Sequence, residues 1–163
     1  MVGLAQGIEF LWLYRFVRSA REAMPTTDII IFTDENSLRG DKHGYVANDY
    51  STMLTMYNVS VVLFDAQRDL EPHQVHFHPS TYRWLLFRTW AHNEGRFTCM
   101  RGGVPVNMPV FSSYASLMFV DARDTVYQSD IFKHVEEKGL CAHTKQLLHE
   151  TPHINTLSIN SRY

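Results

Sequence analysis

The fold of this chain is indicated first by the stretch Leu117-Met118-Phe119-Val120-Asp121-Ala122-Arg123-Asp124. A continuous apolar run that stops at a carboxylate is typical of a strand buried on both faces of a parallel sheet. Open α/β sheets bind ligands beyond the carboxyl ends of their strands, so we expect the functional site at Asp121. Asp121 and Asp124 could together hold Mg²⁺ or Mn²⁺, with phosphate oxygens completing the coordination. A simpler interpretation is that the acids form a turn and that Arg123 neutralises both.

Helical and strand patterns alternate along the rest of the chain. The predicted elements are a helix at 4–24, a strand at 28–34, a short helix at 49–57, a strand at 59–64, a helix at 80–90, the strand that ends at Asp121, a short helix at 131–138 and an edge strand at 140–143. The connection at 95–116 holds either a hairpin or a functional loop. This order predicts one α/β domain over residues 1–163, with a mostly parallel, Rossmann-like sheet and flanking helices.

Composition and charge exclude several classes of protein. Of the 163 residues, 45% are hydrophobic and 20% charged, which is typical of a globular domain. A net charge of -2 gives no general attraction for nucleic acid, so we expect no nucleic-acid partner. The apolar segment 8–17 contains Glu9 and Arg15 and is shorter than the roughly 20 residues of a membrane span, so none is predicted.

The residues that follow the apolar run match a longer motif. They read Asp-x-Arg-Asp-x-x-aromatic-Gln-x-Asp-x-Phe and comprise Asp121, Arg123, Asp124, Tyr127, Gln128, Asp130 and Phe132. In this motif the chain resembles the nucleotide-sugar-dependent glycosyltransferases of the GT-A fold, in the group with an expanded Asp-x-Asp site. The resemblance implies a transferase that moves a sugar from a nucleotide diphosphate sugar to a hydroxyl of a glycan or glycoprotein. It also implies Mn²⁺ or Mg²⁺ as the cofactor.

The same resemblance implies roles for single residues. Asp124 would bind the metal directly, and Asp121 would bind the metal or the ribose hydroxyls of the donor. Arg123 could reach a phosphate, Arg83 could approach the donor diphosphate, and Asp34 could approach the nucleotide. Each has a structural alternative: a salt bridge for Arg123, an exposed helix face for Arg83, and a helix cap or turn for Asp34. No catalytic residue is assigned.

The chain departs from the family pattern at both ends. Family members begin with a strand, whereas the first helix predicted here starts almost at Met1, and they continue past the position of Tyr163. The resemblance therefore predicts a chain truncated at both ends. It favours the Golgi or secretory lumen over the cytoplasm. Two alternatives stay open: a phosphotransferase or phosphatase that uses Asp121 as its nucleophile, and a non-catalytic remnant that binds a nucleotide or a partner.

Overall fold

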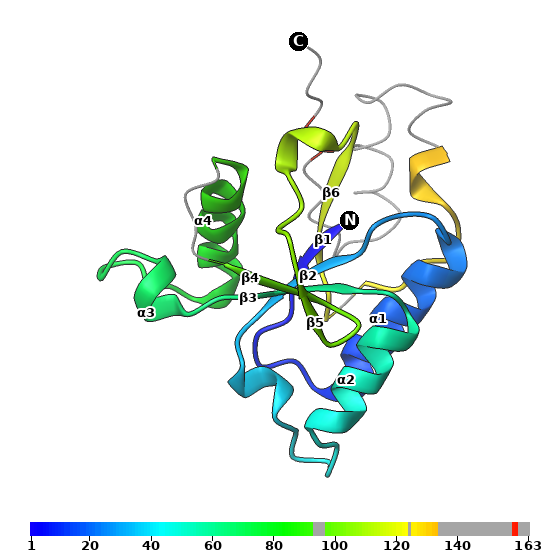
Figure 1. Ribbon diagram of the computed structural model, residues 1–163, viewed down its shortest axis with the longest axis horizontal. Helices are drawn as coiled ribbons and strands as arrows, with labels where there is room; N and C mark the ends of the chain where they lie inside the picture. The colour runs from blue at the N-terminus through cyan, green and yellow to red at the C-terminus, as the bar shows by residue number, and fades with distance from the viewer. Residues whose placement is uncertain (93–96, 124, 134–157, 160–163) are drawn as a thin grey trace.

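The computed structural model describes residues 1–92, 97–123, 125–133 and 158–159 (Figure 1). Its elements are β1 (Val2–Leu4), α1 (Phe10–Ala23), β2 (Ile30–Thr33), η1 (Asn36–Leu38), α2 (Ala47–Met56), β3 (Ser60–Leu63), α3 (Ala66–Asp69), α4 (Pro79–Ala91), β4 (Thr98–Arg101), β5 (Val104–Val106), η2 (Phe111–Ser113), β6 (Leu117–Asp121) and β7 (Ser158–Ile159). The strands form one seven-stranded sheet in the order β5-β4-β3-β2-β1-β6-β7.

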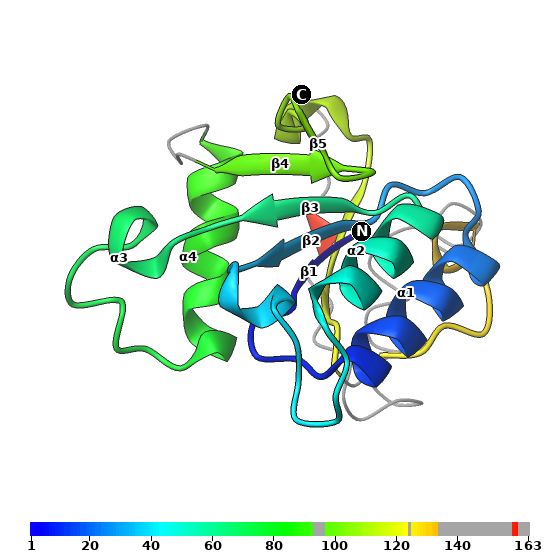
Figure 2. The same cartoon turned by 60° about the horizontal axis from the view of Figure 1, so that its bottom comes forward.

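The centre of the sheet is parallel. β1 pairs with β2 and β6, and β2 pairs with β3, all in parallel register. β4, β5 and β7 add antiparallel strands at the two sides, and Figure 2 shows the arrowhead of β4 opposed to those of β2 and β3. The predicted class is therefore confirmed at the level of an α/β protein with a mostly parallel sheet and flanking helices.

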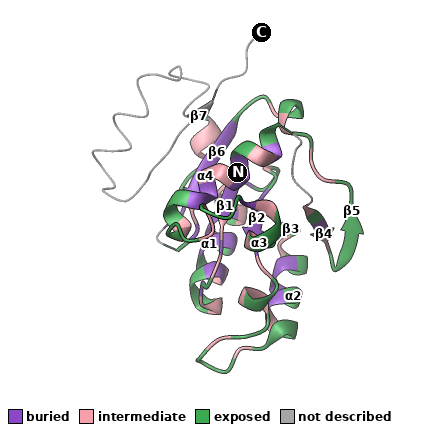
Figure 3. Ribbon diagram, turned by 90° about the vertical axis from the view of Figure 1, so that its left-hand side faces the viewer, coloured by how far each residue is buried: buried purple, intermediate pink, exposed green. Residues whose placement is uncertain are grey.

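The central strands are buried on both faces, as their continuous apolar runs predict. Alternate side chains enter two separate cores, because successive residues of a strand point to opposite faces. Ile31 and Val120 belong to the core that contains α1 and α2, whereas Phe32 and Phe119 belong to the core that contains α4. In Figure 1 the strands lie between α4 on one side and α1 with α2 on the other. Figure 3 shows the buried residues gathered on the strands and on the inner faces of these helices.

Helix α4 begins as the sequence predicts. Pro79 occupies its first turn, where a missing N–H costs nothing, and the His78 ring nitrogen accepts a hydrogen bond from the Ser80 N–H as the N-cap. In the core that contains α4, Phe119 of β6 stacks on Phe87 of α4 with ring centroids 4.9 Å apart. The helix is therefore anchored to β6, the strand that ends at Asp121.

The beginning of the chain differs from the prediction. Residues 2–4 form the strand β1, and α1 begins at Phe10, so the expectation of a helix starting almost at Met1 is wrong, as is the expectation that a strand before it is missing. Leu4 and Ile8 lie at helical spacing, but Gly7 between them has a φ of 60°, which ends any helical run. Side chains of the neighbouring strands also limit the space at Gly3 of β1. A Cβ at this position would lie 3.4 Å from side-chain atoms of Ile31 and of Val120.

The connection before β6 contains a hairpin. β4 and β5 pair antiparallel across Gly102 and Gly103, whose φ angles of 59° and 77° suit a two-residue hairpin turn. The hairpin alternative predicted for residues 95–116 is thus confirmed, and α2 confirms the predicted helix at 49–57. Residues 131–133 are helical after the cap residue Asp130, while the predicted helix end at 134–138 and the edge strand at 140–143 lie outside the described residues.

No helix in the described part of the chain is long and apolar enough to cross a membrane.

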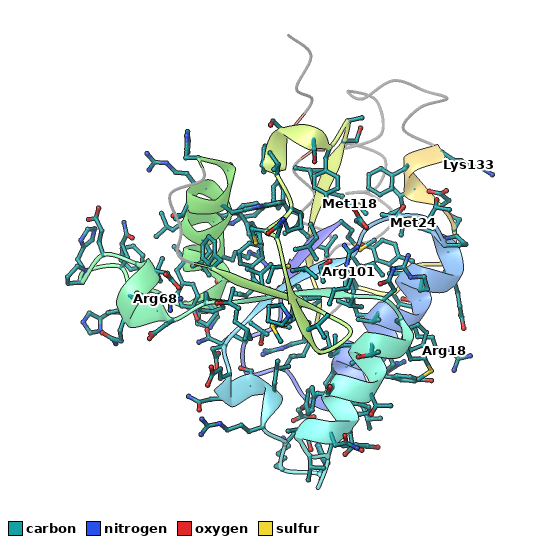
Figure 4. The ribbon with its side chains drawn as sticks, in the orientation of Figure 1. Arg18, Met24, Arg68, Arg101, Met118 and Lys133 are labelled. Carbon is teal, nitrogen blue, oxygen red and sulfur yellow. The ribbon has the colours of Figure 1, made fainter. Side chains whose placement is uncertain are left out.

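Arg21 ties the end of α1 to two loops. Its guanidinium donates to the carbonyl oxygens of Pro25, Thr27, Tyr57 and Asn58 at 2.8–3.3 Å. Arg18, one turn earlier, forms exposed contacts with the Glu22 carboxylate and the Tyr14 hydroxyl. Figure 4 shows Arg18 at the outer side of α1.

We therefore expect Arg21→Lys to lower the free energy of unfolding by about 1–3 kcal/mol, because an ammonium group cannot reach four carbonyls from one position. Arg18→Lys is the matched control and is expected to change it by less than about 0.5 kcal/mol. Urea unfolding of both variants measures the difference. Equal effects would contradict the role assigned to Arg21.

Candidate functional site

The topology of the sheet places a candidate site between β1 and β6. From β1 the chain proceeds through α1 to β2 and then β3 on one side, whereas β6 lies on the other side of β1. Such a reversal of strand order opens a crevice beyond the carboxyl ends of the strands, where α/β proteins bind ligands. A hollow of about 150 Å³ lies at this point, and its polar lining comprises Gln6, His78, Ser80, Arg83, Asp121 and Arg123. We call it the β1/β6 hollow.

A part-buried ion pair crosses this hollow. The Arg83 Nη1 donates to the Asp121 Oδ2 at 3.1 Å, joining the second turn of α4 to the end of β6. The Arg83 side chain is 8% exposed and that of Asp121 is 38% exposed. The guanidinium also lies over the ring of Trp84, 5.2 Å from its centre. The structure thus places Arg83 at the predicted site, and the alternative of an exposed helix face for Arg83 is wrong.

The loop after β6 holds the second oxygen of Asp121. Its Oδ1 accepts a hydrogen bond from the Arg123 N–H, and its main-chain carbonyl accepts one from the Thr125 hydroxyl. The Arg123 side chain is exposed and lines the hollow, and among the described residues it forms no ion pair. Asp121 therefore pairs with Arg83 and not with Arg123, while the other acid considered for a salt bridge with Arg123, Asp124, lies outside the described residues.

Two side chains that line the hollow each carry a polar atom without a hydrogen-bond partner in the described part of the chain. The Gln6 Oε1 and the Arg83 Nε are buried, and neither has a hydrogen bond within the part of the chain that the structure describes. Each such atom costs about 1–3 kcal/mol. Buried unpaired groups are rare in folded proteins.

Asp34 lies in a neighbouring hollow. Its carboxylate accepts from the N–H and the hydroxyl of Ser37, so it caps η1. Together with Asp65, which caps α3 through the Gln67 N–H, it lines a hollow of about 570 Å³ beyond the ends of β2 and β3. We call this the β2/β3 hollow. The structure therefore separates Asp34 from the Arg83–Asp121 pair, and Gln6 is the one residue of the described ranges that lines both hollows.

The charge of the β1/β6 hollow favours an anion. Among the described residues, the lining holds two positive charges, on Arg83 and Arg123, and one carboxylate, that of Asp121. The second predicted metal ligand, Asp124, lies outside the described residues. No group of three or more His, Cys, Asp or Glu side chains within the described ranges could hold a metal ion. Asp121 by itself offers one free lone pair on each oxygen, which fits one half of the predicted metal site.

Two tyrosines close in sequence to Arg83 and Asp121, Tyr82 and Tyr127, are buried. Burial, with the nearby Asp34 carboxylate as a smaller cause, raises the pKa of Tyr82 to about 12, so its hydroxyl stays neutral. Burial also raises the pKa of Tyr127, whose ring lies 6.0 Å from that of Phe16 and whose N–H donates to the Ser19 hydroxyl. Tyr127 therefore packs the loop after Asp121 against α1. Asp130 caps the next helix through the Phe132 N–H, as predicted.

Gln6 was missed by the sequence analysis. The residue follows β1 directly, but the prediction of a helix over 4–24 concealed that strand and its carboxyl end. The signal that could have found it is Gly7, because a glycine inside a helical pattern indicates a turn. His78 and Ser80 stood in the opening of the predicted α4 helix but received no role in the site.

We expect Asp121→Ala to lower the free energy of unfolding by about 1–3 kcal/mol, because it leaves the buried Arg83 guanidinium without its counter-ion. Arg123→Ala, two residues later, is the control and should change it by less than about 0.5 kcal/mol. Chemical denaturation of both variants tests this. A loss for Arg123→Ala as large as that for Asp121→Ala would refute the assignment of the pair.

Comparison with known proteins finds no matching family model, no matching curated protein and no matching solved structure.

Proposed function

We propose that this protein is a glycosyltransferase that moves a sugar from a nucleotide diphosphate sugar to a hydroxyl of a glycan or glycoprotein. In this proposal the diphosphate of the donor binds in the β1/β6 hollow. The observation that carries it is the buried Arg83 guanidinium, held by Asp121 at the switch point of a parallel sheet with its Nε unpaired. The match of Asp121, Arg123 and Asp130 to the expanded Asp-x-Asp motif supports the same assignment.

The chemistry of the hollow suits a departing diphosphate. Transfer of a glycosyl group leaves negative charge on the diphosphate oxygens, and fixed positive groups in a site with little water stabilise that charge. A guanidinium presents several N–H donors in one plane and binds phosphate through two of them. Arg83 is oriented by Asp121 and by the Trp84 ring before any ligand arrives, so little reorganisation is needed.

The proposal includes a divalent cation bound beside the diphosphate. Asp121 and Asp124 would hold Mn²⁺ or Mg²⁺, hard cations that take carboxylate and phosphate oxygens as ligands. Such an ion would supply further neutralisation of the leaving diphosphate. The negative charges of Asp121 and Asp124 would balance the positive charges of Arg123 and Arg83. The charge of the diphosphate would then be balanced by that of the cation. The role of Asp121 is then to orient Arg83 and to present an oxygen to the metal.

Diphosphate binding is tested with two arginines of one helix. Arg83→Met is expected to weaken binding of UDP or GDP at least tenfold, since it removes a charge-assisted hydrogen bond from a buried site. Arg88→Met, on the exposed face of α4, is the matched control and should leave the affinity unchanged. Isothermal titration calorimetry gives both dissociation constants. If wild-type protein binds neither nucleotide, with or without Mn²⁺, the proposal fails.

The metal is tested by linkage to stability. In the presence of UDP or GDP, Mn²⁺ should raise the unfolding temperature of the wild type, because a ligand that binds only the folded state stabilises it. Asp124→Ala should remove that increment while leaving the unfolding temperature without ligands unchanged. Differential scanning calorimetry measures both. An equal Mn²⁺ increment in the variant would show that Asp124 is no ligand.

The alternative of an aspartate nucleophile has its own test. In that case the protein would hydrolyse a generic phosphomonoester, and Asp121→Asn would abolish the activity. We expect no such hydrolysis, because Asp121 and Asp124 stand one residue farther apart than the two acids that this class of enzyme uses.

A further inference from the structure

Ser19 is a buried polar residue inside the helix α1. It is buried together with Phe16, Val17 and Ala20 of the same helix. Serine is less favourable than alanine in a helix interior, because its hydroxyl competes for nearby backbone groups. Buried hydroxyls are hydrogen-bonded in nearly all folded proteins, so the partners of Ser19 show what the residue does.

The hydroxyl of Ser19 connects α1 to the loop that follows β6. It donates to the Phe16 carbonyl at 3.0 Å and accepts from the Tyr127 N–H at 3.1 Å, 108 residues later. A hydroxyl can do both at once, since it has one donor and two acceptor sites. Figure 1 shows the chain after β6 passing beside α1. Within the described ranges this is the one hydrogen bond between α1 and the loop, so the separation of the two depends on it.

The loop is fixed at both ends, and Arg123 lies between them. At its start, the Asp121 Oδ1 accepts from the Arg123 N–H at 3.1 Å, and the Asp121 carbonyl accepts from the Thr125 hydroxyl at 2.6 Å. At its end, the Tyr127 ring belongs to the core that contains α1, and the Tyr127 N–H is bonded to Ser19. The backbone path between the two ends is therefore set partly by β6 and partly by α1.

Burial within the loop separates anchoring residues from the residue that faces solvent. Ala122 is 0% exposed and Thr125 is 4% exposed, whereas the Arg123 side chain is exposed and lines the β1/β6 hollow. The direction of Arg123 therefore follows from the path of the loop backbone. Without the Ser19 oxygen, the buried Tyr127 N–H would have no acceptor in the protein, and the loop would shift until water reached it.

We infer that Ser19 is a positioning residue, which acts through the Tyr127 N–H to hold the loop after β6 in the path that keeps Arg123 at the β1/β6 hollow. The inference rests on the proposed function, because it takes a diphosphate in that hollow to contact Arg123 as well as Arg83. The ligand then meets two guanidinium groups from different elements. Arg83 is held by its own helix, whereas the position of Arg123 depends on Ser19.

Ser19→Ala tests the position of the loop. In metal-free buffer it should weaken UDP binding roughly fivefold, because Arg123 loses its charge-assisted contact with the phosphate oxygens. Ser113→Ala is the matched control, since the Ser113 hydroxyl also donates to a carbonyl three residues earlier, that of Val110. It should leave the UDP affinity unchanged. Isothermal titration calorimetry measures both variants. No loss for Ser19→Ala, or an equal loss for Ser113→Ala, would overturn the inference.

A double-mutant cycle separates positioning from a general structural effect. Arg123→Met should weaken UDP binding at least as much as Ser19→Ala does. In the Arg123→Met background, Ser19→Ala should then weaken it by less than about twofold more, because the group that Ser19 positions is already absent. A merely structural role for Ser19 would give additive losses. Additive losses, or an unchanged UDP affinity of Arg123→Met, would refute the inference.

Two further variants remove the effect of stability. Arg21→Lys lies on the same helix and is expected to lower the free energy of unfolding, but it should leave the UDP affinity unchanged. An equal loss of affinity for Arg21→Lys would mean that stability, and not the loop, explains the result for Ser19. Ser19→Cys keeps the shape of the side chain with a weaker acceptor, so it replaces Ser19→Ala in the cycle if the alanine variant does not fold.

The outcomes also separate the two proposals. If the wild type binds neither UDP nor GDP, with or without Mn²⁺, the proposed function and the role of Ser19 fail together. If Arg83→Met weakens UDP binding and Ser19→Ala does not, only the role of Ser19 fails. UDP binding by the wild type that requires Mn²⁺ would mean that the loop acts through the metal, and would also overturn the role of Ser19 toward Arg123.

Discussion

The architecture depends on one short strand that is hydrogen-bonded on both sides. β1 is only three residues long, yet it pairs in parallel with β2 and with β6, so its backbone groups are satisfied from two directions. Gly3 at its centre lets the side chains of Ile31 and Val120 meet over it. Because β1 stands where the strand order reverses, the same pairing that completes the sheet also opens the crevice at its carboxyl edge.

The site is built from three separate parts of the chain that this edge brings together. Gln6 comes from the turn after β1, Arg83 from α4, and Asp121 from the end of β6. α4 is fixed to the sheet by aromatic contacts such as that of Phe87 with Phe119, so the position of Arg83 follows from core packing. The Arg83–Asp121 pair is therefore a structural link between helix and strand, and it lies at the edge where we propose that a diphosphate binds.

The carboxylates at the ends of the strands differ in their hydrogen-bond partners. Asp34 and Asp65 follow the strands β2 and β3, and their oxygens accept hydrogen bonds from Ser37 and from Gln67, so they act as caps. Asp121 instead accepts a hydrogen bond from Arg83 of the helix α4 and lines the β1/β6 hollow. Position at a strand end thus identifies candidates, and the hydrogen bonds of each carboxylate distinguish the local caps from Asp121, which joins two layers.

From the sequence alone one could predict the buried strands at 30–33, 60–63 and 117–121, the helix over 79–91 and the α/β class, because apolar periodicity and proline positions are local properties. The tertiary structure alone decided that residues 2–4 are a strand, since so short a segment is stable only between two neighbours. It also decided that Arg83 pairs with Asp121, 38 residues away, and that Gln6 joins them. Such contacts depend on packing between layers, which local periodicity does not record.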